Sequence, residues 1–111
     1  MLKTRVLIPL WNEDVAPRFD LAQEALVALL GENGEIAEKQ IIVLPQASAE
    51  GLCDFIIRER VDMVVCCAVD EECYQYLTWK KIKIFESVGG SAADVLERVR
   101  DGSLQSGDMV L

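Results

Sequence analysis

The feature that most constrains the fold is a continuous apolar run, MVVCCAV, at residues 63–69. A half-exposed strand or an amphipathic helix would interrupt such a run with polar side chains. Unbroken apolar runs of this length are typical of parallel strands that are covered on both faces. The run therefore predicts an α/β fold in which helices lie on both sides of a sheet.

The segments around this run predict the remaining elements. Apolar stretches rich in branched residues predict strands at 5–10, 24–30, 36–44 and 82–85, with a turn at GENGE, residues 31–35. Helices are predicted to begin after the N-cap residues Ser48, Asp70 and Ser91, and Gly102 ends the last one. The order is β-β-β-α-β-α-β-α, which predicts a single α/β domain with a mixed five-stranded sheet.

Charge and composition exclude several classes of function. The 111 residues carry a formal charge of −8, and the basic residues are scattered, so no nucleic-acid partner is expected. The chain has no histidine, which excludes a Ser-His or Cys-His hydrolase. No segment has the length of a membrane span or the pattern of a secretion signal. These observations predict a cytoplasmic protein with reduced thiols and no membrane partner.

Five motifs follow one another in a recognisable order: APRFDLAQEALVALL at 16–30, ENGE at 32–35, VDMVV at 61–65, IKIFES at 82–87, and VGGSAADVLERVRDGSL at 88–104. Together they resemble the dinitrogenase iron–molybdenum cofactor biosynthesis family. The resemblance covers residues 1–104 and leaves 105–111 as a C-terminal tail, either loose or paired with a neighbour. It implies a ribonuclease H-like three-layer fold. It also implies a nitrogen-fixation-related protein that binds or carries an iron–molybdenum or iron–sulfur cluster.

The sequence departs from the family pattern at three places. Phe19 is followed by Asp20 and Leu21, where many members carry glycine and then a basic residue or histidine. A glycine-rich strand end is replaced by residues 66–68, CCA, and the histidine that some carriers use for cofactor binding has no counterpart. The resemblance therefore implies the fold more strongly than the cofactor.

The four cysteines are the candidate metal ligands. Cys66 and Cys67 are adjacent, so in an extended strand they point to opposite faces and cannot reach one ion. One interpretation is that most of these thiols pack in the core as small apolar side chains. The other places Cys67 at the carboxyl end of its strand and Cys73 in the first turn after Asp70, where a helix N-terminus lowers the pKa of a thiol. If the protein binds a metal, we expect Cys67 and Cys73 to be its ligands.

Three further residues complete the predicted cofactor site. Gly89 and Gly90 precede the helix capped by Ser91, so their backbone N–H groups are candidates for binding an anion. Arg18, in the loop of residues 11–20, is a candidate clamp for a metallocluster or a small anionic ligand. The alternatives are an ordinary turn for the two glycines and a surface ion pair with Asp20 for Arg18.

Three functions remain open. The first is a non-catalytic binding protein, which needs exposed donors but no activated base. The second is a protein-interaction or regulatory subunit that has lost cofactor binding, with a homodimer or another protein as its partner. The third, a ribonuclease H-like nuclease, needs clustered carboxylates for metal ions, and the first strand has no acid in its middle.

Overall fold

A mixed sheet forms the middle layer of the protein, in a computed structural model that describes residues 3–110. Its strands lie in the order β4, β3, β1, β5, β6, with bounds Ile36–Val43, Glu24–Leu30, Thr4–Trp11, Met63–Val65 and Lys83–Phe85. β1 pairs antiparallel with β3 and parallel with β5, and β5 pairs parallel with β6. The predicted mixed sheet is confirmed, but it has six strands rather than five, because the two-residue strand β2 (Asp14–Val15) also pairs with β1.

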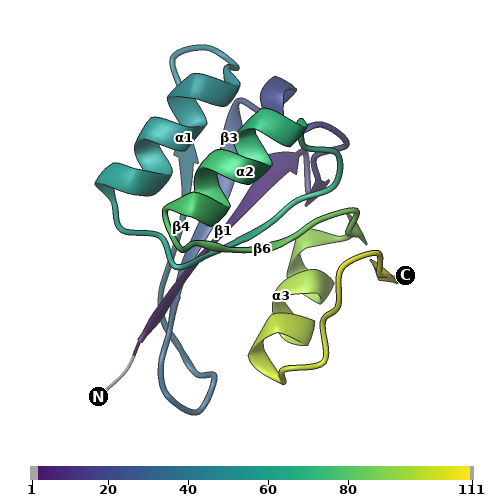
Figure 1. The fold of residues 1–111 in the computed structure, drawn as a ribbon. Coiled ribbons are helices and arrows are strands. Elements are labelled where there is room, and N and C mark those ends of the chain that lie inside the picture. The colour runs from purple at the N-terminus through teal and green to yellow at the C-terminus, as the bar shows by residue number, and fades with distance from the viewer. Residues whose placement is uncertain (1–2, 111) are drawn as a thin grey trace.

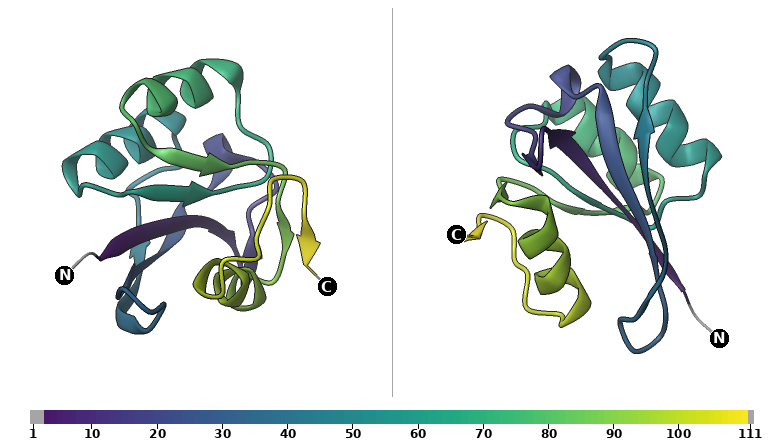
Figure 2. Two further views of the ribbon diagram at one scale, coloured as in Figure 1. Left: turned by 60° about the horizontal axis from the view of Figure 1, so that its bottom comes forward. Right: turned by 180° about the vertical axis from the view of Figure 1, so that it is seen from behind.

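Helices cover both faces of the sheet. α1 (Ala49–Arg58) and α2 (Glu71–Trp79) lie on one face, and α3 (Ala92–Arg100) lies on the other (Figure 1 and the left view of Figure 2). Each helix begins at its predicted N-cap: the side chains of Ser48, Asp70 and Ser91 accept hydrogen bonds from backbone N–H groups three residues on. Such caps satisfy N–H groups that a helix cannot pair internally, which fixes where each helix starts.

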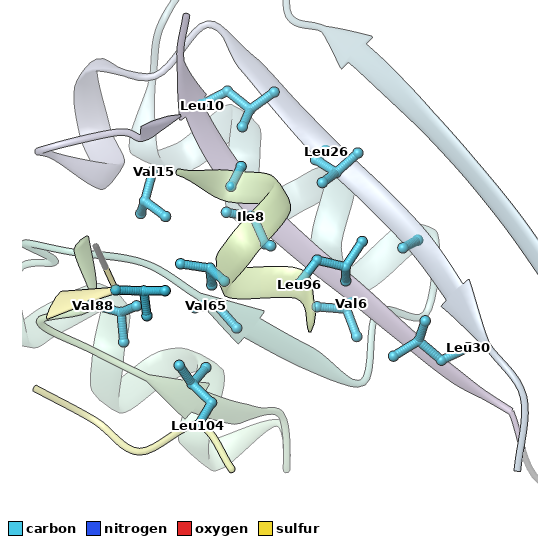
Figure 3. Packing of buried hydrophobic residues seen from close by; sticks show 14 residues of the cluster. Val6, Ile8, Leu10, Val15, Leu26, Leu30, Val65, Val88, Leu96 and Leu104 are labelled. Atoms are coloured by element: carbon cyan, nitrogen blue, oxygen red, sulfur yellow. The ribbon is translucent and has the colours of Figure 1, made fainter. Parts of the chain in front are cut away.

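Alternation along β1 divides the core into two halves. Val6, Ile8 and Leu10 face α3, whereas Leu7 faces α1 and α2. Val65, Val88, Leu96 and Leu104 are among the residues that complete the α3-side core, which is shown in Figure 3. Phe19 is buried in the α1/α2-side core.

Regular pairing of β5 ends at Val65, earlier than the apolar run suggests. The next three residues are held by loops on both sides. The backbone N–H of Ala68 donates to the carbonyl of Pro17 (3.0 Å), and that of Phe19 donates to the carbonyl of Ala68 (2.8 Å). The carbonyl of Cys67 accepts from the N–H of Ser87 (2.9 Å). Cys67 therefore sits where β5 passes into the loop layer at the carboxyl edge of the sheet.

The C-terminal tail pairs with its own chain. β8 (Met109–Val110) runs parallel to β7 (Gly89–Gly90), and Val110 is buried in the α3-side core. The two short strands lie next to the N-terminus of α3 (left view of Figure 2). None of the helices in residues 3–110 has the length and apolar character needed to cross a membrane.

Candidate functional site

An open cavity of about 590 Å³ lies at the carboxyl ends of β1 and β5, and we call it the carboxyl-end cavity. In open α/β sheets, ligands bind beyond the carboxyl ends of the strands. Its wall comes from β1, β2 (Asp14–Val15), the segment after β5, β7, the start of α3, and β8. The lining residues are Trp11, Asp14, Val15, Pro17, Cys67, Gly89, Gly90, Ser91, Asp94, Met109 and Val110.

A tight reversal at the end of β1 builds one side of this cavity. The chain turns back after Trp11, which pairs with Asp14, and Asn12 takes a positive φ of 57° in the turn. Asparagine tolerates this left-handed conformation better than most residues. Asp14 then bridges to Ser91, and the N–H of Ala92 donates to the carbonyl of Glu13 (2.9 Å). The reversal thus ties the end of β1 to the start of α3.

The charged side chains in the lining of the carboxyl-end cavity are both acidic, Asp14 and Asp94. The remaining lining is mostly apolar, with Trp11, Val15, Pro17, Met109 and Val110 contributing. No lysine or arginine lines the cavity within the described part of the chain. Carboxylates attract cations and repel anions, so this cavity favours a cationic or neutral ligand over a small anion.

Cys67 is the thiol that opens into this cavity. Its side chain is half-buried and packs against the α3-side core, whereas Cys66 is buried in the α1/α2-side core. The two adjacent thiols therefore lie on opposite sides of the sheet, as alternation predicted. Burial, together with the negative charge of Glu86, raises the pKa of the Cys66 thiol to about 12, so Cys66 is an inert core residue.

This pKa shift predicts an alkaline loss of stability. The thiol of Cys66 has an ordinary pKa of 9.0 when unfolded and a raised one when folded, so its contribution is complete below pH 9 and is lost as the pH rises toward 12. We expect the free energy of unfolding of the wild type to fall, relative to a Cys66→Ala variant, by about 1 kcal/mol per pH unit above pH 9. Urea unfolding of both proteins at pH 8, 9 and 10 measures this difference. Parallel pH dependences would contradict the assignment of Cys66 as a buried neutral thiol.

Cys73 lies in a different part of the protein from Cys67. It lines an open hollow between α1 and α2 together with Cys53, on the opposite face of the sheet from the carboxyl-end cavity. The structure therefore does not bring Cys67 and Cys73 to one site. Burial and a hydrogen bond to Asp70 raise the pKa of the Cys73 thiol. The predicted lowering was wrong, because burial disfavours the thiolate and the Asp70 carboxylate at the helix N-terminus opposes a second negative charge there.

Gly89 and Gly90 line the carboxyl-end cavity, and part of their role is structural. The N–H of Gly89 donates to the carbonyl of Asp108 (3.0 Å), so this group is already paired with the chain leading into β8. Gly90 has a φ of +117°, a conformation that residues with a Cβ rarely adopt. The glycines thus permit β8 to pack closely at the cavity wall.

Arg18 does not line the carboxyl-end cavity. Its guanidinium makes two hydrogen bonds to Asp20, from Nε to Oδ1 (3.0 Å) and from a terminal nitrogen to Oδ2 (2.6 Å). The pair is exposed, so it adds little stability. Arg18 lines a neighbouring small hollow with Trp11, Pro17 and Leu21. This placement is the surface pair that the sequence offered as the alternative to an anion clamp.

Among the cavity residues that sequence reasoning missed are Asp14, Asp94 and Met109. Asp14 follows the predicted strand, and Asp94 lies three residues after a predicted N-cap. The local position of each was therefore predictable, but the sequence did not indicate that both line one cavity. Met109 lies in the tail, whose pairing has no local signal. Across residues 3–110, no three His, Cys, Asp or Glu side chains are grouped closely enough to hold a metal ion by themselves. A metal group in the carboxyl-end cavity would therefore use Cys67 as its protein thiolate, with the Met109 thioether as the other sulfur in the lining.

Solved structures of other proteins share this fold. The crystal structure of PH0822 has a TM-score of 0.83 and 19% identity over 93% of this chain and 94% of that chain. The crystal structure of a "putative dinitrogenase" of Methanocaldococcus jannaschii has a TM-score of 0.77 and 22% identity over 95% of each chain. A "putative NifB protein" of Thermotoga, from the DUF35 family, has a TM-score of 0.71 and 15% identity over 97% of each chain. No family model and no curated protein matches this chain. At these identities the likeness establishes the shared fold.

Proposed function

We propose that this protein is a non-catalytic binding protein that holds a metal or metal–sulfur group in the carboxyl-end cavity, with Cys67 as the anchoring thiolate. The observation behind the proposal is the position of Cys67: a half-buried thiol in a largely apolar cavity beyond the carboxyl ends of β1 and β5. Cysteine thiolates are the protein ligands of iron–sulfur clusters and of soft metal ions.

The openness of the site suits carriage. A single protein thiolate leaves the other metal positions to ligands that arrive with the group, so the group can be loaded and released. The Met109 side chain lies directly over Gly89, which places a second, weaker sulfur donor at the same wall. A cluster held this way would exchange more readily than one enclosed by four cysteines.

The fold comparisons support this class of ligand. One similar structure is described as a "putative dinitrogenase" and another as a "putative NifB protein", so a role related to nitrogen fixation is part of the proposal. We also infer a ribonuclease H-like topology, in which three antiparallel strands are followed by two parallel strands joined through helices. The strand order β4, β3, β1, β5, β6 supports that assignment.

The acidic lining limits the charge of the ligands that the cavity can bind. Asp14 and Asp94 oppose a strongly anionic group, so a small free anion is less favoured than a metal group of low net charge. The iron–molybdenum cofactor is one candidate within this proposal, and a simpler iron–sulfur or single-metal group is another. A nuclease is the least favoured alternative, because no three acidic side chains within residues 3–110 are close enough together to hold a metal ion.

A protein-interaction subunit is the second candidate, and it has one observation in its favour. β4 is an edge strand, and its Ile41 and Val43 side chains are 60% and 63% exposed. Exposed apolar edge strands are templates for pairing with another chain. On this reading a homodimer or another protein partner would add a strand beside β4.

Anaerobic metal analysis tests the first proposal. The protein is purified without oxygen, incubated with iron and sulfide, desalted, and analysed for iron, molybdenum and zinc alongside its absorption spectrum. We expect metal in the wild type and a loss of at least tenfold in a Cys67→Ala variant. Cys66→Ala is the matched control, because the neighbouring thiol faces the other side of the sheet and should retain the metal.

Two results would count against metal carriage. One is wild-type protein that holds no metal under any loading condition, which would favour the interaction subunit. The other is equal metal content in the wild type and in Cys67→Ala, which would place the metal elsewhere. Thermal unfolding of both variants checks that they remain folded.

A further inference from the structure

A second pair of sulfur atoms lies between α1 and α2. Cys53 is on the buried side of α1, and Cys73 is in the first turn of α2. Both line an open hollow of about 540 Å³ on the sheet face opposite to the carboxyl-end cavity. This hollow, which we call the dithiol hollow, has no role in the function proposed above.

The charges around the dithiol hollow all have one sign. Four carboxylates line it, from Glu50, Asp54, Asp70 and Glu72, and no basic side chain of the described residues lines it. A concave surface with charges of one sign concentrates counterions, which here are cations. The remaining lining residues are Ala49 and Tyr76, together with the two cysteines.

The two thiols share the dithiol hollow and are close enough for each to affect the pKa of the other. Burial raises the pKa of the Cys53 thiol, and the neighbouring Cys73 thiol lowers it. Burial also raises the pKa of the Cys73 thiol, which hydrogen-bonds to Asp70 and lies beside Cys53. Both cysteines therefore line one acidic hollow, from two neighbouring helices. Neither is in a disulfide.

Two adjacent thiols in an acidic hollow fit one class of ligand. Thiolates are soft donors, and they select soft d¹⁰ ions such as Cu⁺ over Mg²⁺ or Ca²⁺. A tetrahedral zinc site needs four ligands, and residues 3–110 contain no group of three metal-binding side chains. Two sulfurs satisfy a soft monovalent ion, which accepts low coordination numbers.

We propose that Cys53 and Cys73 form a second metal site, which binds one Cu⁺ ion between their sulfur atoms. Two S–Cu bonds form as two S–H bonds break, and both protons pass to solvent. The copper stays Cu⁺ throughout, so the step requires no oxidant or reductant. The surrounding carboxylates favour the approach of the cation, and the bound ion offsets one of the two new thiolate charges, which leaves the complex with a net charge of −1.

A Cu⁺ titration with a competing chromophoric chelator tests the site. The reduced full chain is titrated without oxygen, after thiol counting confirms four free cysteines. We expect one tightly bound Cu⁺ per chain, with affinity reduced at least about 100-fold in Cys53→Ser and in Cys73→Ser. Cys67→Ser is the matched control, and it should keep this ion because Cys67 lies on the other face of the sheet. X-ray absorption should show two sulfur neighbours around the copper.

The outcomes separate this site from the carboxyl-end cavity. Loss of the ion in Cys67→Ser, with retention in Cys53→Ser and Cys73→Ser, would overturn the dithiol site and support the first cavity. A change of less than threefold in all three variants would also overturn it, because the ion would then be held adventitiously by carboxylates. Circular dichroism monitors folding. If Cys53→Ser does not fold, the Cu⁺ affinity of Cys73→Ser decides the test, because Cys73 is only half-buried.

Discussion

A Phe19→Ala substitution is expected to lower the free energy of unfolding by about 3–5 kcal/mol, the usual cost of truncating a fully buried aromatic side chain. Phe19 is 1% exposed and is the largest of the fully buried side chains. It anchors a short 3-10 helix, η1 (Phe19–Leu21), in the core beneath α1 and α2. Alanine would leave a cavity that the surrounding side chains fill only partly. Urea denaturation of both proteins measures the loss.

Leu21→Ala is the matched control for this prediction. Leu21 lies in the same 3-10 helix but is 55% exposed, so its truncation should change the free energy of unfolding by less than about 0.5 kcal/mol. Equal losses in the two variants would mean that η1 is not held by Phe19. The same test bears on the candidate site, because the N–H of Phe19 bonds to Ala68, next to Cys67.

Local signals were sufficient to predict most of the fold. The N-caps at Ser48, Asp70 and Ser91 depend on a side chain and a backbone N–H three residues away, so a few neighbouring letters determine each helix start. The strand at residues 24–30 was predicted within its observed bounds, because the GENGE turn paired it with the strand that follows. β5 was predicted too long, because the loops that interrupt its pairing come from distant parts of the chain.

The candidate site was only partly predictable, since it depends on contacts between distant segments. Cys67 was placed correctly at the carboxyl end of its strand, because strand order and side-chain alternation determine that position. β8 and β7 are two-residue strands that lie about twenty positions apart in the sequence. Strands this short have no hydrophobic periodicity from which their pairing could be predicted. The placement of Cys53 and Cys73 in one hollow depends on how α1 packs against α2, which the sequence of either helix alone does not encode.

The second large effect is expected from Gly90→Ala, which should lower the free energy of unfolding by about 3 kcal/mol. Part of the cost is conformational, because Gly90 has a φ of +117° and residues with a Cβ are strained there by about 1–3 kcal/mol. The rest is steric, because a Cβ at Gly90 would overlap the backbone carbonyl oxygen of Val110. Backbone cannot rotate away as a side chain can, so β8 must separate from β7 and expose Val110. Burying a valine contributes about 1.5–3 kcal/mol, which limits the steric part of the cost.

Gly107→Ala separates the two causes. Gly107 also has a positive φ, of +91°, but a Cβ there would meet no atom within 4 Å, so this variant should show the conformational cost alone. Urea denaturation should therefore give Gly90→Ala a lower free energy of unfolding than Gly107→Ala. The difference should be about the free energy contributed by burying Val110. Hydrogen exchange should accelerate at the N–H of Gly89, which bonds to Asp108, only in Gly90→Ala.

Because β8 also supplies Met109 and Val110 to the carboxyl-end cavity, the same variant should lose metal bound at Cys67, whereas Gly107→Ala should retain it. Equal stability losses in the two glycine variants, with unchanged hydrogen exchange at Gly89, would contradict this prediction. They would show that β8 can pack beside β7 even when residue 90 carries a Cβ.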